Sequence, residues 1–248
     1  MSIELCSLNA MFLFCKGVKA NFILLQETHS VKDDEKFWKQ QWGDNILFTH
    51  GTSHSAGVMI LFYRFAGKII DYKSDGNGHW IMVVFEIFDF KFIVINIYGY
   101  NNRSLNRSMM SKLSRDISEW SELYRTSNII TGGDFNIAPN SWMDRKPPKG
   151  LQPNIDDTFS SFCLANHLVD YWRETNPNSK TYTWMSPADT NLCSRLDYWL
   201  LNHVHPFSHD DCANTSEVLD SGVSKMHWSG WEKILHSPQT NASGERTV

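Results

Sequence analysis

The sequence lacks the features that mark several large protein classes. Its five cysteines are scattered, odd in number and without a C-x-x-C pair, which argues against a disulfide framework or a zinc site and for a reducing compartment. A net charge of −4 gives no overall positive field to attract nucleic acid, so DNA binding would need local basic residues or a metal. No apolar run reaches the length of a membrane span, and the first residues do not resemble a signal peptide. We therefore expect an intracellular protein, nuclear or cytoplasmic, without a membrane segment.

Apolar residues are plentiful by contrast. The chain has 248 residues, of which 42% are hydrophobic, enough to bury the core of one large domain or two small ones. Most of them fall in short runs rich in Val, Ile and Phe, which are typical of β-strands. The runs are "NFILLQ", "NILFTH", "AGVMILFY", "HWIMVVFEIF", "FKFIVINIYGY" and "SNIITGGD", followed later by "KTYTWMS" and "SRLDYWLL".

Helical segments interrupt these runs. We expect helices over residues 33–41, 104–123 and 155–166, the second with Ser104 as its N-cap, and a tight hairpin at Asp89. Mixed strands with helices between them predict an α/β sandwich around facing sheets. From about residue 203 the strand pattern stops. We expect one domain over residues 1–202 and a poorly ordered tail over 203–248.

Polar residues follow the predicted strands, at the point where each strand ends. Such positions let a rigid sheet present side chains into a shared cleft. Carboxylates and amides are the oxygen ligands that Mg²⁺ takes, and Mg²⁺ suits phosphate chemistry. The residues are Asn9, Glu27, Tyr98 with Asn101, Asp134 with Asn136, and Asp197.

Each of these residues also has an ordinary structural explanation. Gly-Gly-Asp-Phe-Asn at 132–136 is a usual turn composition, Glu27 reads as a solvated loop residue, and Tyr98 reads as part of the core or its rim. Asp197 is harder to explain in this way, because a carboxylate within an apolar strand is costly to bury unless it is paired.

Taken together, the motifs resemble one family. "SLN", "LLQETH", "AGVMIL", "VINIYGYNN", "GGDFNIAPNSWMDR", "TYTWMSP" and "SRLDYWLL" occur in the order typical of the endonuclease domain of LINE-type (non-LTR) retrotransposons. That domain belongs to the endonuclease/exonuclease/phosphatase superfamily, together with the apurinic/apyrimidinic endonucleases. The resemblance runs from about Ile3 to Leu201. It implies a monomeric four-layer α/β sandwich that nicks a DNA phosphodiester with Mg²⁺, or with Mn²⁺ in its place.

The resemblance also implies roles for individual residues. Glu27 corresponds to the principal metal ligand, Asp134 to the general base and a further ligand, and Asn136 to the residue that orients Asp134 and contacts metal and phosphate. The remaining assignments are Asn9 on the Asp134 side of the site, Tyr98 donating to a phosphate oxygen, and Asp197 hydrogen-bonding a histidine near the C-terminus. Asn101, Arg145 and Thr183 correspond to cleft or DNA-contact positions.

Two departures from the family pattern affect the site. The closing Ser-Asp-His strand is not found: Ser208-His209-Asp210 has the wrong order, and at the expected spacing Asp220 is followed by Ser221 in place of the histidine. The segment after Asn9 is also shortened, so "MFLFCKG" follows at once. We therefore expect a fold incomplete at its C-terminal strand, with an uncovered sheet edge.

Three functional hypotheses follow. The first is a Mg²⁺-dependent DNA-nicking endonuclease whose activity is severely impaired, because serine cannot replace the histidine. The second is a catalytically dead fragment that keeps the fold as a weak DNA- or protein-binding module. The third, a phosphatase of the same superfamily acting on small phosphoesters, fits "GDFNIAPNSWMDR" less well.

Overall fold

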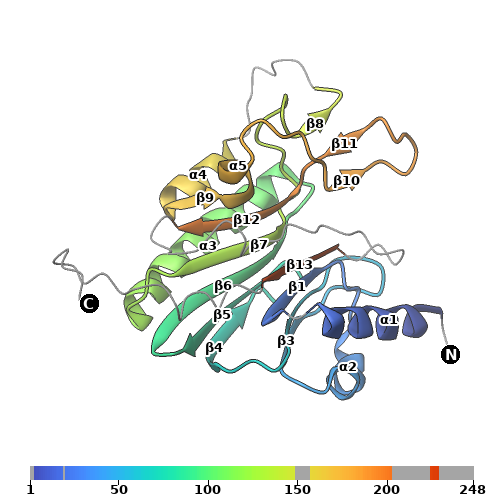
Figure 1. Ribbon diagram of the computed structural model, residues 1–248, viewed down its shortest axis with the longest axis vertical. Coiled ribbons are helices and arrows are strands. Elements are labelled where there is room, and N and C mark those ends of the chain that lie inside the picture. Colours follow the sequence, from blue (N-terminus) through green and yellow to red (C-terminus); the bar gives the residue numbers. More distant parts are fainter. Residues whose placement is uncertain (1–2, 19, 149–156, 203–223, 229–248) are drawn as a thin grey trace, which may run out of the picture.

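The computed structural model of the chain describes residues 3–18, 20–148, 157–202 and 224–228 (Figure 1). The helices are α1 (Ile3–Gly17), η1 (Lys32–Asp34), α2 (Glu35–Trp42), α3 (Arg103–Tyr124), α4 (Thr158–Ala165) and α5 (Tyr171–Thr175). The strands are β1 (Phe22–Gln26), β2 (Ile46–Thr49), β3 (Val58–Phe62), β4 (Lys68–Ser74), β5 (Trp80–Ile87), β6 (Phe90–Tyr98), β7 (Ile129–Asp134), β8 (Arg145–Lys146), β9 (Leu168–Asp170), β10 (Trp184–Met185), β11 (Cys193–Ser194), β12 (Asp197–Asn202) and β13 (Ser224–Trp228).

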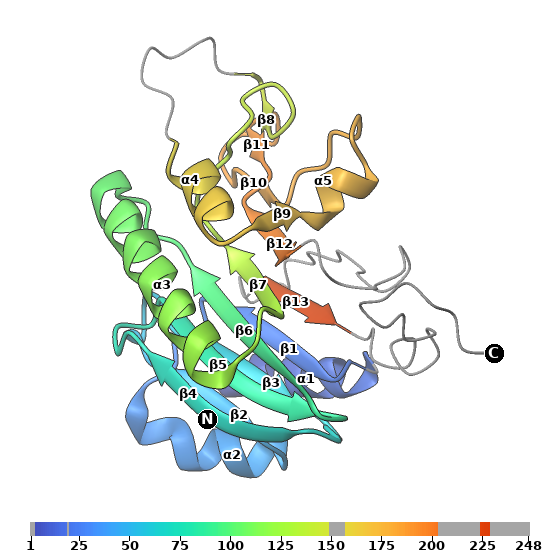
Figure 2. The same cartoon turned by 90° about the vertical axis from the view of Figure 1, so that its left-hand side faces the viewer.

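Two sheets face each other between two layers of helices. The order β4-β5-β6-β7-β12-β9 forms one sheet and β13-β1-β3-β2 the other, while β10-β11-β8 form a small separate sheet. Figure 2 shows α3 and α4 over the six-stranded sheet, with α1 and α2 beyond the four-stranded sheet. The predicted four-layer α/β sandwich is confirmed. No helix of the described segments is long and apolar enough to cross a membrane.

The period-two pattern of the strands generates these layers. In β5, Trp80, Met82 and Val84 pack under α3, whereas Ile81 and Val83 point to the facing sheet. A third cluster, which includes Ile23 and Leu25 of β1, packs against α1 and α2. Because successive side chains of a strand alternate between its faces, each long apolar strand serves two cores at once.

A buried amide pair joins the two sheets beneath the ends of β1 and β6. Asn96 of β6 donates through Nδ2 to the carbonyls of Leu25 (3.0 Å) and Met59 (2.8 Å), and it accepts from Gln26 Nε2 at 2.5 Å. Both amides are fully buried. A buried polar group is tolerated when it is hydrogen-bonded, and here it fixes the register of one sheet against the other.

The N-terminal prediction was wrong. Asn9 was expected at the end of a strand, but residues 3–17 form α1, so Asn9 lies within a helix. Met11, Phe12 and Cys15 of this helix are buried against the outer face of the four-stranded sheet. The composition of the N-terminal residues suits a strand as well as a helix, and short apolar runs do not distinguish the two.

The C-terminal strand expected to be missing is present. Residues 224–228 form β13, which pairs antiparallel with β1 in the register Leu24↔Met226, so the predicted uncovered edge of β1 does not exist. The predicted domain over residues 1–202 ends with β12, and β13 lies within the predicted tail. The remainder of that tail, including Asp220 and Ser221, lies outside the described residues.

Smaller differences concern boundaries. The Asp89 hairpin is confirmed, with Phe88 and Asp89 both at positive φ. The cap of α3 is Asn102, not Ser104: its side chain accepts from the main-chain N–H groups of Ser104 and Leu105. "KTYTWMS" forms a strand only at β10, and β4 and β9 were not predicted.

Candidate active site

Three predicted residues stand in one row across neighbouring strands. Tyr98 at the end of β6 lies opposite Asp134 at the end of β7 in a parallel pair. Asp197 pairs with Asp134 from the other side. Asp197, expected inside a strand, is the first residue of β12, and because β12 runs antiparallel to β7 it lies at the same edge.

Glu27 reaches this row from the facing sheet. It follows β1 directly and has a φ of +53°, so the chain turns sharply at the end of the strand. The Tyr98 hydroxyl donates a hydrogen bond to Glu27 Oε1. Thr28 and His29, which follow Glu27, are held by the loop before β3. Their N–H groups donate to the carbonyls of residues 57 and 56, each at 3.0 Å. The site therefore lies where the ends of the two sheets meet.

The two glycines before Asp134 are required by packing. Gly133 has a φ of +133°, and a Cβ there would lie 2.0 Å from the Ile97 carbonyl oxygen. A Cβ at Gly132 would lie 2.8 Å from side-chain atoms of Leu24 and Trp199. Gly132 is therefore needed for close approach of the two sheets, and Gly133 for the turn of the chain toward Asp134.

Asn136 orients the carboxylate of Asp134. Its main-chain N–H donates to Asp134 Oδ1 at 2.8 Å, and its side-chain Nδ2 donates to the Gly99 carbonyl at 2.7 Å. Asn136 has a φ of +52°, a conformation that asparagine tolerates better than most residues. The segment is thus a tight turn and a site loop at once.

The environment of the candidate site opposes the ionisation of Asp134 and of Tyr98. Burial raises the pKa of Asp134 well above its usual range; the charges of Asp197 and Glu27 raise it further, and the N–H bond from Asn136 acts in the opposite sense. Burial, and then the hydrogen bond to Glu27, raise the pKa of Tyr98. Within the described part of the chain, no basic side chain forms an ion pair with Glu27 or Asp134.

This donor set fits a hard cation bound by few protein ligands. No three His, Cys, Asp or Glu side chains of the described residues form a ready-made metal cage. Mg²⁺ does not need such a cage, because it keeps several waters and is usually bound by one or two carboxylates. A cation between Glu27 and Asp134 would supply the positive charge that three neighbouring carboxylates lack.

The other predicted site residues divide into two groups. Thr183 lies beside Asp197, since its Oγ1 accepts from the N–H groups of Leu196 (2.9 Å) and Asp197 (3.1 Å). Asn101 is exposed in the loop before α3, and Arg145 lies on β8 of the small sheet. Neither is hydrogen-bonded to Glu27, Tyr98 or Asp134. Asn9 is in α1.

Sequence reasoning missed an ion network beside the row. Asp144, buried to 1% exposure, accepts from Arg195 Nε at 2.9 Å and from Arg173 Nη2 at 2.8 Å. Arg195 also pairs with Asp170 and lies over the Tyr198 ring, 4.4 Å from its centroid. This network connects the small sheet to β12 next to Asp197. The sequence signal that could have indicated this network was Arg195, a charged residue in the apolar run "SRLDYWLL".

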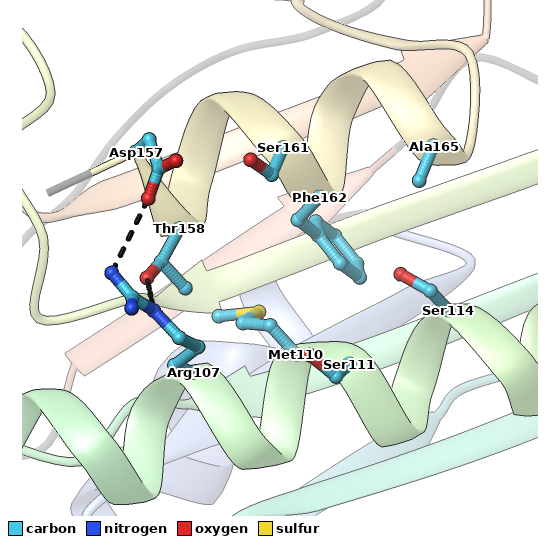
Figure 3. Close-up of a pocket in the computed structure, with 9 residues that line it drawn as sticks. All are labelled: Arg107, Met110, Ser111, Ser114, Asp157, Thr158, Ser161, Phe162 and Ala165. Carbon is cyan, nitrogen blue, oxygen red and sulfur yellow. Dashed lines mark hydrogen bonds and ion pairs between the residues drawn. The ribbon is translucent and has the colours of Figure 1, made fainter.

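A separate hollow of about 440 Å³ lies between α3 and α4 (Figure 3). Its polar lining is mostly hydroxyl groups, and its carboxylate, Asp157, pairs with Arg107 at 3.3 Å. None of the row residues lines it. The hollow therefore belongs to the helix packing and not to the candidate active site.

Known proteins share this sequence pattern and this fold. The sequence model of the Endonuclease/Exonuclease/phosphatase family matches residues 7–219. The Transposon TX1 uncharacterized 149 kDa protein of Xenopus laevis is 25% identical over 255 residues, which cover 89% of this chain and 19% of that protein. The chain thus spans about a fifth of the length of this relative.

Solved structures agree on the architecture. AP endonuclease LMAP from Leishmania major superposes with a TM-score of 0.68 at 18% identity, covering 91% of this chain and 84% of that one. The Xenopus laevis APE2 catalytic domain gives a TM-score of 0.67 at 16% identity, covering 88% and 86%. At such identities the likeness establishes the fold.

Proposed function

The chain belongs to the endonuclease/exonuclease/phosphatase family, and on that premise we propose that it hydrolyses a DNA phosphodiester with a divalent cation, Mg²⁺ or Mn²⁺, at a strongly reduced rate. The observation that carries the proposal is the row of Tyr98, Asp134 and Asp197 facing Glu27. A transposon protein among its relatives and AP endonucleases among its structural neighbours favour DNA as the substrate.

Each residue has a role that its contacts support. Glu27, Asp134 and the Asn136 amide would hold the cation, which supplies Lewis acidity at the phosphate when bound. Asp134, aligned by the N–H of Asn136, would take the proton from the attacking water. The Tyr98 hydroxyl, which donates a hydrogen bond to Glu27 in this structure, would donate to a phosphate oxygen when substrate is bound. Thr183 would hold Asp197 in place through its main-chain contacts.

The cation has a second task in an acidic protein. The net charge is −4, and the carboxylates of the candidate site concentrate negative charge where a phosphate must approach. DNA binding depends on neutralising phosphates with positive charge. A bound divalent cation would both lower the proton affinity of Asp134 and remove this repulsion.

The reduced rate rests on the sequence. Ser221 stands where the family pattern has its histidine, and a positioned acid–base group contributes about 10²–10⁴-fold to a rate. Asn9 lies in a helix and not at a strand end, which removes another residue of the family pattern from that position. These two observations also favour the second candidate, an inactive module that retains the fold and binds DNA or protein.

A plasmid-nicking assay separates the candidates. The protein is incubated with supercoiled plasmid and Mg²⁺ or Mn²⁺, beside Asp134→Asn as the matched control. Slow nicking that needs the cation and is lost in the control supports the nuclease. Equal nicking by both proteins would trace the activity to a contaminant, and metal-dependent plasmid binding without nicking would favour the inactive module. Hydrolysis of p-nitrophenyl phosphate in place of plasmid nicking would favour the small-phosphoester phosphatase.

A further inference from the structure

A histidine absent from the motif pattern is anchored to the strand end that carries Tyr98. His79 immediately precedes β5, opposite Tyr98. The main-chain N–H of Tyr98 donates a hydrogen bond to the His79 carbonyl at 2.7 Å. The ring adds a second bond, between its Nδ1 and the Tyr98 carbonyl, also at 2.7 Å. Because a carbonyl only accepts, Nδ1 carries the proton.

The His79 ring is also stacked on two tyrosine rings, those of Tyr98 and Tyr100. It lies parallel to the Tyr98 ring, with 8° between the planes and 5.5 Å between the centroids. The Tyr100 ring lies against it at 3.5 Å and 23°. Tyr98 ends β6 and Tyr100 follows two residues later, and the imidazole is stacked on both rings.

The backbone of His79 is fixed as well. Its N–H donates to the Asp75 carboxylate, at 3.2 Å to Oδ1 and 3.3 Å to Oδ2. The same carboxylate accepts from the N–H of Asn77, so it closes the turn before β5. The imidazole therefore projects from a turn that is closed by hydrogen bonds to Asp75.

We propose that His79 is a positioning residue that fixes the Tyr98 hydroxyl over Glu27, by anchoring the main chain of Tyr98 and by stacking on its ring. This inference rests on the proposed function. The hydroxyl hydrogen-bonds Glu27 and so connects the six-stranded sheet to the residue that follows β1 of the facing sheet. A displacement of about 1 Å in such a group can cost about 10²-fold in rate.

Matched variants separate the two contacts. His79→Phe keeps a ring that can stack but loses the Nδ1 donor. His79→Asn keeps a donor at the position of Nδ1 but loses the ring. If both contacts position Tyr98, each variant should lower kcat for nicking by about 10-fold and leave KM within about twofold, and His79→Ala should lower kcat by about 10²-fold. Unchanged kcat in His79→Ala would overturn the proposal.

A double-mutant cycle tests the route of the effect. In a Tyr98→Phe background there is no hydroxyl to position, so His79→Ala should cost less than threefold in kcat. A full additional 10²-fold loss in that background would show that His79 acts independently of Tyr98 and would overturn the positioning role.

A measurement without catalysis keeps this test separate from the proposed function. The ring signals of Tyr98 can be followed by NMR with ¹³C-labelled tyrosine, assigned through Tyr98→Phe. We expect exchange broadening of the Tyr98 ring in His79→Ala and sharp signals in the unmodified chain. If the chain does not nick DNA but this broadening appears, the nuclease proposal fails and the positioning role stands. Equally sharp signals in both proteins would overturn the positioning role even if nicking is observed.

Discussion

Replacing Asp134 by Asn should stabilise the metal-free protein while it removes activity. In the folded chain burial and the charges of Asp197 and Glu27 raise the pKa of Asp134, so this carboxyl holds its proton more tightly than it does in the unfolded chain. An amide has no charge to bury. It can still accept the bond from Asn136 N, which is 2.8 Å from Asp134 Oδ1.

The sign of the pH dependence follows from this raised pKa. The stability that Asp134 contributes is complete below the unfolded value of about 3.9 and is lost as the pH rises through the folded pKa. Asp134→Asn suffers no such loss. The variant should therefore have the higher free energy of unfolding at pH 8, by roughly 0.5–2 kcal/mol, the range of single stabilising substitutions. At pH 5 the difference should be smaller.

A divalent cation should reverse the order. Ligand binding stabilises the folded state by about 2.7 kcal/mol at a concentration 100-fold above its dissociation constant, and the variant has lost one of its ligands. The assay is urea denaturation at pH 5 and pH 8, with and without Mg²⁺, followed by tryptophan fluorescence. A variant that is less stable than the unmodified chain at pH 8 without metal would refute the argument from the buried carboxylates. A variant that gains as much from Mg²⁺ would refute Asp134 as a ligand.

Three further outcomes test the site and its surroundings. Tyr98→Phe should lower nicking by about 10²-fold, measured as kcat on plasmid, while unfolding changes by only about 1 kcal/mol, since one hydrogen bond to Glu27 is lost and the ring remains; unchanged kcat would contradict the role of the hydroxyl. Asp144→Ala should cost about 3–5 kcal/mol in urea denaturation, because Arg195, only 2% exposed, loses a carboxylate 2.9 Å from its Nε; a cost below about 1 kcal/mol would mean that water or other groups replace that partner. Gly133→Ala should yield no cooperatively folded protein, because its Cβ would meet a carbonyl oxygen at 2.0 Å; a normal melting curve by circular dichroism would contradict the close approach.

Several parts of the site could be predicted from the sequence for a definite reason. Glu27 follows an apolar strand directly, and Tyr98 and Asp134 are the last residues of theirs, so their placement at the sheet ends depends only on recognising the strand. Asn136 follows from Asp134, because the turn between them is local. Asp197 was found through its unusual position in an apolar run, although its strand begins there and does not end there.

The wrong predictions concern segments whose structure is decided by tertiary contacts and not by their local sequence pattern. The apolar composition at the N-terminus suits a strand or a helix, and the structure forms α1, which buries Met11, Phe12 and Cys15 against the four-stranded sheet. Residues 224–228 carry no strand pattern, yet the free edge of β1 recruits them as β13. Backbone pairing at an edge needs N–H and C=O groups more than it needs a particular side-chain pattern.

The sequence by itself determined the layered fold, because a strand whose successive residues are apolar must bury both of its faces. It also determined which acidic and amide residues stand at the strand ends. Only the tertiary structure decided how those residues act on one another. The register of β6, β7 and β12 places Tyr98, Asp134 and Asp197 in one row, and the facing sheet brings Glu27 to the Tyr98 hydroxyl. Burial and the mutual repulsion of carboxylates, which raise the pKa of Asp134, arise from that long-range pairing and cannot be read from any local stretch of the chain.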